Sequence, residues 1–234
     1  MIELLYDLAD FIKRKINITY LEVISTAKVP IVKFDHISNV SIDIVLNNDG
    51  GIVNGNLLKD YAVRYPMMRP LTLVLKVFMA QRKLRETYSG GIGSFVLSVL
   101  VISFLQMRQR LMVNKKQQSS WNLASLLVEF FQMYGGSFNI IQTGISIQND
   151  GTFFHKRARE GEWTTPRRPV AFSIEHPIEH DADVGRNSFL APKIRKAFEH
   201  AHEVLITVLS QGRSESYLGY IIRADDPFLL HRCP

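Results

Sequence analysis

The hydrophobic period of the chain changes near residue 50, and this change limits the folds that the chain can adopt. Apolar residues alternate with polar ones over residues 40–46, whereas they recur every three or four positions from residue 56 onward. The first pattern is typical of strands and the second of helices. The turn-forming sequence Asn47-Asn-Asp-Gly-Gly51 separates the two. The chain is therefore expected to be an α+β protein, with a small sheet region before residue 50 and a mainly helical region after it.

The predicted elements follow this division. Helices are expected over residues 2–16, 57–65, 71–84, 95–107, 121–134 and 193–209, and Gly135-Gly136 is expected to end the fifth of these. Strands are expected over residues 29–34 and 40–46, joined by a hairpin connection, with further strand-like pieces over 140–147 and 170–174. Residues 156–168 are predicted to be a solvated loop. Residues after Gly212 have no clear period and are predicted to form a poorly tied tail.

Charge and cysteine content narrow the classes of function. Lys and Arg number 28 against 22 Asp and Glu, a formal net charge of +6 that favours an anionic partner such as RNA or DNA. The only cysteine, Cys233, excludes a disulfide within the chain, which fits a reducing compartment. No apolar run reaches the roughly 18 residues of a membrane span. The chain is therefore expected to work with an anionic partner and without a membrane.

Asp43 is an unusual residue for the middle of a strand, because aspartate is depleted there. Alternation places Ser41, Asp43 and Val45 on one face and the apolar residues 40, 42, 44 and 46 on the other. One interpretation is a solvent-facing carboxylate on a half-exposed sheet. The other is a metal ligand or general base held on a rigid strand. Spacing alone favours the first interpretation and leaves the second open.

Two later stretches also combine residue types that suit a ligand site. Ser89-Gly-Gly-Ile-Gly-Ser-Phe95 precedes an apolar helix, where glycines allow close backbone approach and a helix N-terminus can bind phosphate. The same pattern also suits an ordinary helix-entry loop. Residues 175–183 hold six ionisable side chains, but Pro177 lies between His176 and His180 and disfavours a zinc site. The alternative for this stretch is an acidic surface loop.

In their order along the chain, these motifs resemble those of the terminal RNA nucleotidyltransferases of the DNA polymerase β-like superfamily. The resemblance is to the nuclear poly(A) polymerases that tag RNA for the exosome, and it spans about residues 20–210. It is carried by Lys28-Val-Pro-Ile-Val-Lys33, Val40-Ser-Ile-Asp-Ile44, Leu73-Val-Leu-Lys-Val-Phe78, Gly90-Gly-Ile-Gly-Ser-Phe95 and Asp183-Val-Gly-Arg-Asn-Ser-Phe189. The resemblance implies the remnant of a nucleotidyltransferase palm sheet at residues 1–50. A mainly helical, poly(A)-polymerase-associated central domain would follow at 51–211, with a nucleotide recognition loop at 174–189 and a tail at 212–234.

The resemblance also implies roles for individual residues. Asp43 would be catalytic and metal-binding, as the third of three carboxylates that hold two Mg²⁺ or Mn²⁺ ions. The first two belong to a Gly-Ser segment followed by an Asp-x-Asp pair, a pattern that is absent upstream of Asp43, so the chain is expected to be an incomplete or inactive form. Nucleotide binding is assigned to Asn54 (ribose), Lys76 and Ser94 (triphosphate), Phe95 (base stacking), Glu179, Asp183 and Arg186. His176 and Ala182 depart from the family pattern, which leaves base selectivity open.

The expected activity is template-independent addition of AMP from ATP to RNA 3′ ends, as part of RNA surveillance in the nucleus or nucleolus. Phosphates of the RNA are expected to contact Arg108, Arg110, Lys115, Lys116, Arg157 and Arg167, unless these stretches are simply solvated. The resemblance implies a zinc-knuckle RNA-binding protein and an RNA helicase as partners. Two alternatives stay open: a non-catalytic nucleotide- or RNA-binding scaffold, and a terminal uridylyltransferase.

Overall fold

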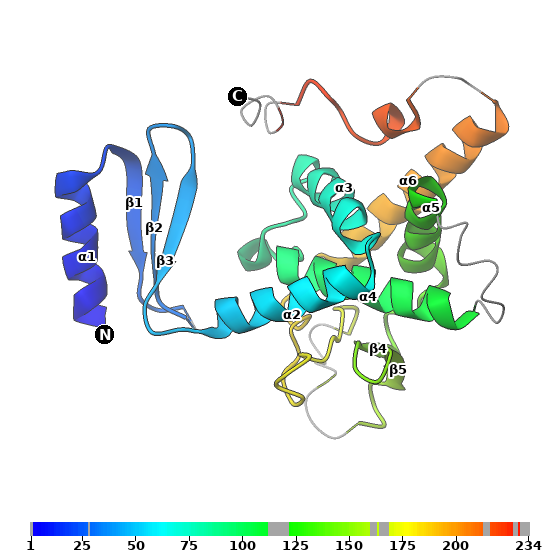
Figure 1. Ribbon diagram of the computed structural model, residues 1–234, viewed down its shortest axis with the longest axis horizontal. Coiled ribbons are helices and arrows are strands. Elements are labelled where there is room, and N and C mark those ends of the chain that lie inside the picture. The colour runs from blue at the N-terminus through cyan, green and yellow to red at the C-terminus, as the bar shows by residue number, and fades with distance from the viewer. Residues whose placement is uncertain are drawn as a thin grey trace. The chain divides into compact units, whose positions relative to one another are not determined.

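The structure is a computed structural model that describes residues 2–27, 29–111, 122–159, 163, 169–212, 216–226 and 229 (Figure 1). The chain divides into two compact units, Met1–Leu57 and Leu58–Pro234. None of the helices in the described ranges is long and apolar enough to cross a membrane.

The first unit is one helix packed on a small antiparallel sheet. Helix α1 (Ile2–Lys15) is followed by β1 (Ile18–Ile24), β2 (Ile31–His36) and β3 (Ser41–Val45), in the sheet order β1-β2-β3 (Figure 1). The helical spacing of Leu5, Ala9 and Ile12 buries these side chains against Val32 and Phe34 of the central strand. The predicted helix, the two predicted strands and the hairpin between them are confirmed.

Strand β1 was not predicted, and its irregular register explains why. Ile18 pairs with His36 and Tyr20 pairs with Asp35, so a bulge at this point leaves one extra residue in β1. Because of the extra residue, Ile18 reaches the same core as Leu21 although the two lie three positions apart. This spacing breaks the period of two on which strand prediction depends.

The second unit is mainly helical. Its elements are α2 (Gly50–Arg64), which begins in the first unit, α3 (Met68–Gln81), η1 (Thr87–Ser89), α4 (Ser94–Leu111), α5 (Leu123–Gln132), η3 (Met133–Ser137), β4 (Thr143–Ser146), β5 (Thr152–His155), α6 (Ala191–Ser210) and η4 (Tyr217–Tyr220). Helix α4 is the centre of the core, since residues 96–106 are buried on every side of it. The rings of Phe78, Phe130, Phe131 and Phe198 join α3, α5 and α6, with centroids 5.0 to 6.2 Å apart.

Two predicted element boundaries are wrong. Helix α2 begins at Gly50 and not at residue 57, because the Asn48 side chain accepts a hydrogen bond of 2.9 Å from the Gly50 N–H group and caps this end. Gly135 and Gly136 do not end α5; they lie in the single π-helical turn η3, which continues the helix to Ser137. The Arg195 guanidinium of α6 donates to both glycine carbonyl groups and satisfies this terminus.

The prediction that residues after Gly212 form a tail with few contacts is also wrong over residues 216–226. The Gln81 side chain donates to the Arg223 carbonyl (2.7 Å) and accepts from the Arg223 N–H group (3.0 Å). Arg82 donates to the carbonyl of Ile221, a residue that is 4% exposed. These backbone contacts dock the segment on the C-terminal end of α3.

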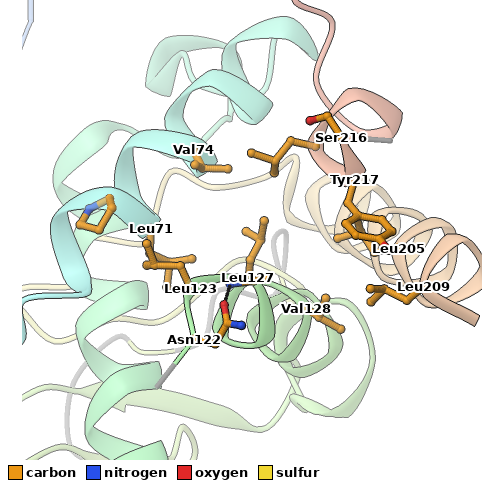
Figure 2. A pocket seen from close by; sticks show the side chains of 13 residues that line it. Leu71, Val74, Asn122, Leu123, Leu127, Val128, Leu205, Leu209, Ser216 and Tyr217 are labelled. Atoms are coloured by element: carbon orange, nitrogen blue, oxygen red, sulfur yellow. Dashed lines mark hydrogen bonds between the residues drawn. The ribbon is translucent and has the colours of Figure 1, made fainter. Parts of the chain in front are cut away.

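An apolar groove of about 500 Å³ lies between α3, α5, α6 and the beginning of η4 (Figure 2). Figure 2 shows Leu71 and Val74 facing Leu127, with Leu205 and Tyr217 on the further side. Among the described residues, none of those predicted for nucleotide or RNA binding lines this groove. The groove is therefore distinct from the candidate site described next.

Candidate nucleotide site

Residues 90–95, here the glycine loop, enter helix α4 through a tightly constrained backbone. Gly90 adopts a φ of +87°, and a Cβ atom at this position would lie 2.3 Å from the Phe189 ring. A Cβ atom on Gly91 would lie 2.3 Å from the Leu84 carbonyl oxygen. Both positions thus require glycine. At Gly90 the positive φ and the close approach of the Phe189 ring each exclude a larger residue. Ser94 is exposed in the first turn of α4, where backbone N–H groups have no acceptor within the helix.

Residues 174–189, here the recognition loop, pack directly against the glycine loop. The N–H group of Leu190, the residue that directly follows this loop, donates to the Gly90 carbonyl at 2.9 Å. The rings of Phe95 and His176 also meet, with centroids 5.6 Å apart and planes tilted by 33°. The fold therefore unites two motifs that lie far apart in the sequence, and this contact defines the candidate site.

The Asp183 carboxylate holds the recognition loop in shape. Its Oδ1 atom accepts hydrogen bonds of 2.8 Å from the N–H groups of Ile174 and Gly185. Burial raises the pKa of Asp183, while these two backbone hydrogen bonds act in the opposite direction. The carboxylate is thus engaged within the loop, and its predicted contact with a nucleotide stays a prediction.

Charged side chains that are buried or half-buried support the recognition loop. Arg159 forms an ion pair with Glu175, whose side chain is 6% exposed, and the Arg159 guanidinium lies 4.4 Å from the Phe154 ring centroid and 4.6 Å from that of Trp163. The Lys156 ammonium donates to the carbonyl groups of Ile140 (2.7 Å) and Ala171 (2.8 Å). The predicted solvated loop is wrong at Lys156, which is buried, and Glu175 is not part of an acidic surface. Sequence reasoning missed this cluster because only the tertiary fold supplies its partners.

Burial of Lys156 predicts a specific pH dependence of stability. Burial lowers the pKa of Lys156 to about 8, and the nearby Asp183 acts in the opposite direction. An unfolded lysine has a pKa of about 10.4, so the unfolded chain binds more protons between these values and the folded state gains stability as the pH rises from 8 to 10. We expect this gain to be about 1–2 kcal/mol larger in the wild type than in Lys156→Met. Urea unfolding of both proteins at several pH values measures it, and parallel pH profiles would contradict it.

The other predicted nucleotide-binding residues lie in both units. Lys76 is half-buried on α3, and Glu179 and Arg186 are exposed on the recognition loop. Asn54 lies in the first unit on α2, where its Oδ1 atom is buried and has no hydrogen-bond partner among the described residues. The predicted contact of Asn54 with the ribose of a nucleotide stays a prediction.

Asp43 lies on the exposed face of the sheet in the first unit, as its alternation predicted. Lys33 is its partner on β2, and Lys33 in turn pairs with Glu22 on β1. Opposite charges thus alternate across the three strands. Within the described ranges, no group of three or more His, Cys, Asp or Glu side chains is placed to hold a metal ion. The described residues therefore do not form the expected two-metal site, to which Asp43 contributes one carboxylate at most.

The predicted RNA-binding residues differ in their surroundings. Arg110 and Arg157 are exposed, whereas Arg108 forms an ion pair of 2.7 Å with Glu129 of α5. Lys115, Lys116 and Arg167 lie outside the described residues. Contact with RNA stays a prediction. Of the described residues, Arg110 and Arg157 fit it best, because their side chains are exposed.

Comparison with solved structures identifies the class of fold. The chain is similar to the polymerase core of TRAMP, an RNA surveillance complex, with a TM-score of 0.81 and 30% identity over 94% of this chain and 71% of that chain. A mtPAP structure in complex with UTP has the same fold at 18% identity, with a TM-score of 0.73 over 94% of this chain and 53% of that one. The fold is that of a nucleotidyltransferase polymerase core.

Sequence comparisons identify the family. Residues 2–63 match the central palm domain of mitochondrial-like poly(A) RNA polymerases, and residues 122–182 match the Cid1 family of poly A polymerases. Poly(A) RNA polymerase cid14 of Schizosaccharomyces pombe is 32% identical over 88% of this chain and 30% of its own length. Trf4-2 of Drosophila melanogaster, named as an inactive non-canonical poly(A) RNA polymerase protein, is 33% identical over 86% of this chain and 49% of its own length. The chain belongs to the poly(A) RNA polymerase family of terminal RNA nucleotidyltransferases, and it spans about a third of the length of the first curated relatives.

Proposed function

We propose that this chain forms the nucleotide-binding part of an RNA 3′-terminal adenylyltransferase, which adds AMP from ATP without a template. The observation that carries the proposal is the direct contact between the glycine loop and the recognition loop, made by the Gly90–Leu190 hydrogen bond and the Phe95–His176 ring pair. This contact brings a helix N-terminus, an aromatic ring and an acidic loop to one place. These are the groups that a triphosphate, a base and a base edge require.

Each group has a distinct proposed role. Ser94 and the N–H groups of the first turn of α4 bind the triphosphate, and Lys76 adds a positive charge. Phe95 stacks on the base, and the Glu179 carboxylate accepts a hydrogen bond from the adenine amino group. Contact of Asn54 with the ribose is proposed on the family resemblance alone. Asp43 would give one carboxylate to a Mg²⁺ or Mn²⁺ site, although the described residues alone do not complete such a site.

Replacement of Phe95 tests the nucleotide site. Because base stacking on an aromatic side chain contributes about 1–3 kcal/mol, Phe95→Ala should weaken ATP binding at least about fivefold, while Phe95→Tyr should retain it. Phe11→Ala, at an exposed phenylalanine of α1, is the matched control and should bind as the wild type does. Calorimetric titration with ATP measures the affinities. Equal affinities of Phe95→Ala and the wild type would refute the proposed site.

RNA binding is proposed to involve the exposed Arg110 and Arg157. If each neutralises one phosphate, the double alanine variant should lower the slope of log K against log salt by about 1.4 for single-stranded RNA. The double variant Lys193→Ala/Lys196→Ala removes the same charge from the exposed face of α6 and should leave the slope nearly unchanged. Fluorescence anisotropy with an oligo(A) probe at several salt concentrations makes this comparison. An unchanged slope in the arginine variant would assign these residues to a solvated surface.

The cellular setting is proposed on the family resemblance. We place the protein in the nucleus or nucleolus, where it would act on RNA that is destined for surveillance. The likeness to the polymerase core of TRAMP, an RNA surveillance complex, supports this proposal. The same resemblance suggests a zinc-knuckle RNA-binding protein and an RNA helicase as partners.

Two alternatives to this proposal stay open. A binding scaffold without catalysis is favoured by the relative named as inactive and by the absence, among the described residues, of a group of three or more side chains placed to hold a metal ion. Such a scaffold would bind ATP or RNA but add no nucleotide in any form of the protein. A uridylyltransferase stays open because the side chain of Ala182, whose backbone groups bond to Glu179 and His176, cannot read a base edge and so selects neither base. Its affinity for UTP would exceed that for ATP.

A further inference from the structure

His176 closes the turn of the recognition loop with both its backbone and its ring. Its N–H group donates to the Ala182 carbonyl at 2.8 Å, and the Ala182 N–H group donates to the Glu179 carbonyl at 2.8 Å. The Nδ1 atom of the imidazole accepts from the N–H groups of Ile178 (3.2 Å) and Glu179 (3.0 Å). The backbone of Glu179 is thus fixed at both its N–H and its carbonyl group. Since Nδ1 is the acceptor, the ring must be neutral with its proton on Nε2.

The same imidazole lies against Phe95, at a centroid separation of 5.6 Å and a tilt of 33°. A base between the two rings would need two stacking distances of about 3.5 Å each, more than the rings leave. A base that stacks on Phe95 therefore does not lie between the two rings, and the contact of His176 with Phe95 can persist when a base binds.

We infer that His176 is a positioning residue for the nucleobase, because it joins the stacking ring of Phe95 to the backbone that carries Glu179. The inference rests on the proposed function and deepens it. An amide or carboxylate at position 176 would accept the same two N–H groups but would offer Phe95 no ring. A phenylalanine would offer the ring but no acceptor. Only an imidazole performs both roles, so the two can be separated by substitution.

Three variants separate the roles by calorimetric binding of ATP and UTP to residues 1–234. His176→Asn keeps the acceptor and loses the ring, so it should weaken both nucleotides by a similar factor, about two- to tenfold. His176→Phe keeps the ring and loses the acceptor, which frees Glu179, so the ratio of ATP to UTP affinity should fall by about twofold or more. His176→Ala should show both effects. His200→Ala, at an exposed histidine of α6, is the control and should show neither.

Nitrogen NMR of the nucleotide-free chain provides a second readout. The wild type should show the Nε2–H tautomer of His176 and slow hydrogen exchange at the Ile178 and Glu179 amides. His176→Asn should retain this protection and His176→Phe should lose it. A proton on Nδ1, or unchanged ATP and UTP affinities in His176→Ala, would overturn the inference. If the wild type binds neither nucleotide, the proposed function itself fails, whereas the tautomer and exchange measurements still decide whether His176 holds the turn.

Discussion

Purified residues 1–234 are expected to add no nucleotides to an oligo(A) primer supplied with ATP and Mg²⁺ or Mn²⁺. A single carboxylate cannot hold two metal ions at the required separation of about 3.5–4 Å, and the described residues supply no further cluster of ligands. When a segment that carries the Gly-Ser and Asp-x-Asp pattern is joined upstream, tailing should appear. Asp43→Ala in the joined protein should then lower the rate about a thousandfold or more, since it removes one of three carboxylates at the reacting phosphate.

A neighbouring acid provides the control for Asp43. Asp35 pairs with Ser41, two cross-strand pairs along the sheet from the Lys33–Asp43 pair, and accepts a hydrogen bond of 2.5 Å from Ser41. Asp35→Asn keeps an acceptor for this bond, so tailing by the joined protein should change little. Primer-extension gels provide the rates. Robust tailing by residues 1–234 alone, abolished by Asp43→Ala, would show that the site is complete without the added segment and would contradict this prediction.

Gly135→Ala is expected to produce a large loss of stability in the helical unit. A Cβ atom on Gly135 would lie 2.4 Å from the Glu199 backbone nitrogen and 2.8 Å from its Cα atom. Helix α6 must therefore move, although Arg195 ties it to the carbonyl groups of the same turn. We expect a loss of about 2–4 kcal/mol in the free energy of unfolding and a melting temperature lower by roughly 5–15 °C.

The adjacent glycine gives a matched control. A Cβ atom on Gly136 would meet no atom within 4 Å, and this residue belongs to the same π-helical turn. Gly136→Ala should therefore leave stability unchanged or raise it by up to about 1 kcal/mol. Urea unfolding and thermal melting of the two variants measure the contrast. Equal stabilities of Gly135→Ala and Gly136→Ala would show that α6 does not pack closely against this turn.

Local sequence signals were sufficient for several elements of the fold. The amphipathic spacing of α1 and the apolar run of α4 appear as the predicted helices, because helix period and burial depend on residues within one element. The position of Asp43 on the exposed face of β3 also followed from alternation alone. The glycine loop was correctly placed before a helix, since its glycines and the apolar run after it are both local features.

Features that depend on distant residues could not be predicted in this way. Lys156 has the composition of a surface loop, and only carbonyl groups from two other segments make its burial acceptable. Residues 216–226 have no period of their own and are held by the side chains of Gln81 and Arg82. The contact between Phe95 and His176 joins two motifs whose proximity no spacing within the sequence indicates.

Photo-cross-linking tests the location of the nucleotide site most directly. Residues 1–234 would be irradiated with 8-azido-ATP, and the labelled peptides would be identified by mass spectrometry. The label should fall on the peptide that contains Phe95 and on peptides from residues 174–189, and excess ATP should suppress it. Label confined to other peptides, or label on these peptides that excess ATP does not suppress, would contradict a nucleotide site built from the glycine and recognition loops.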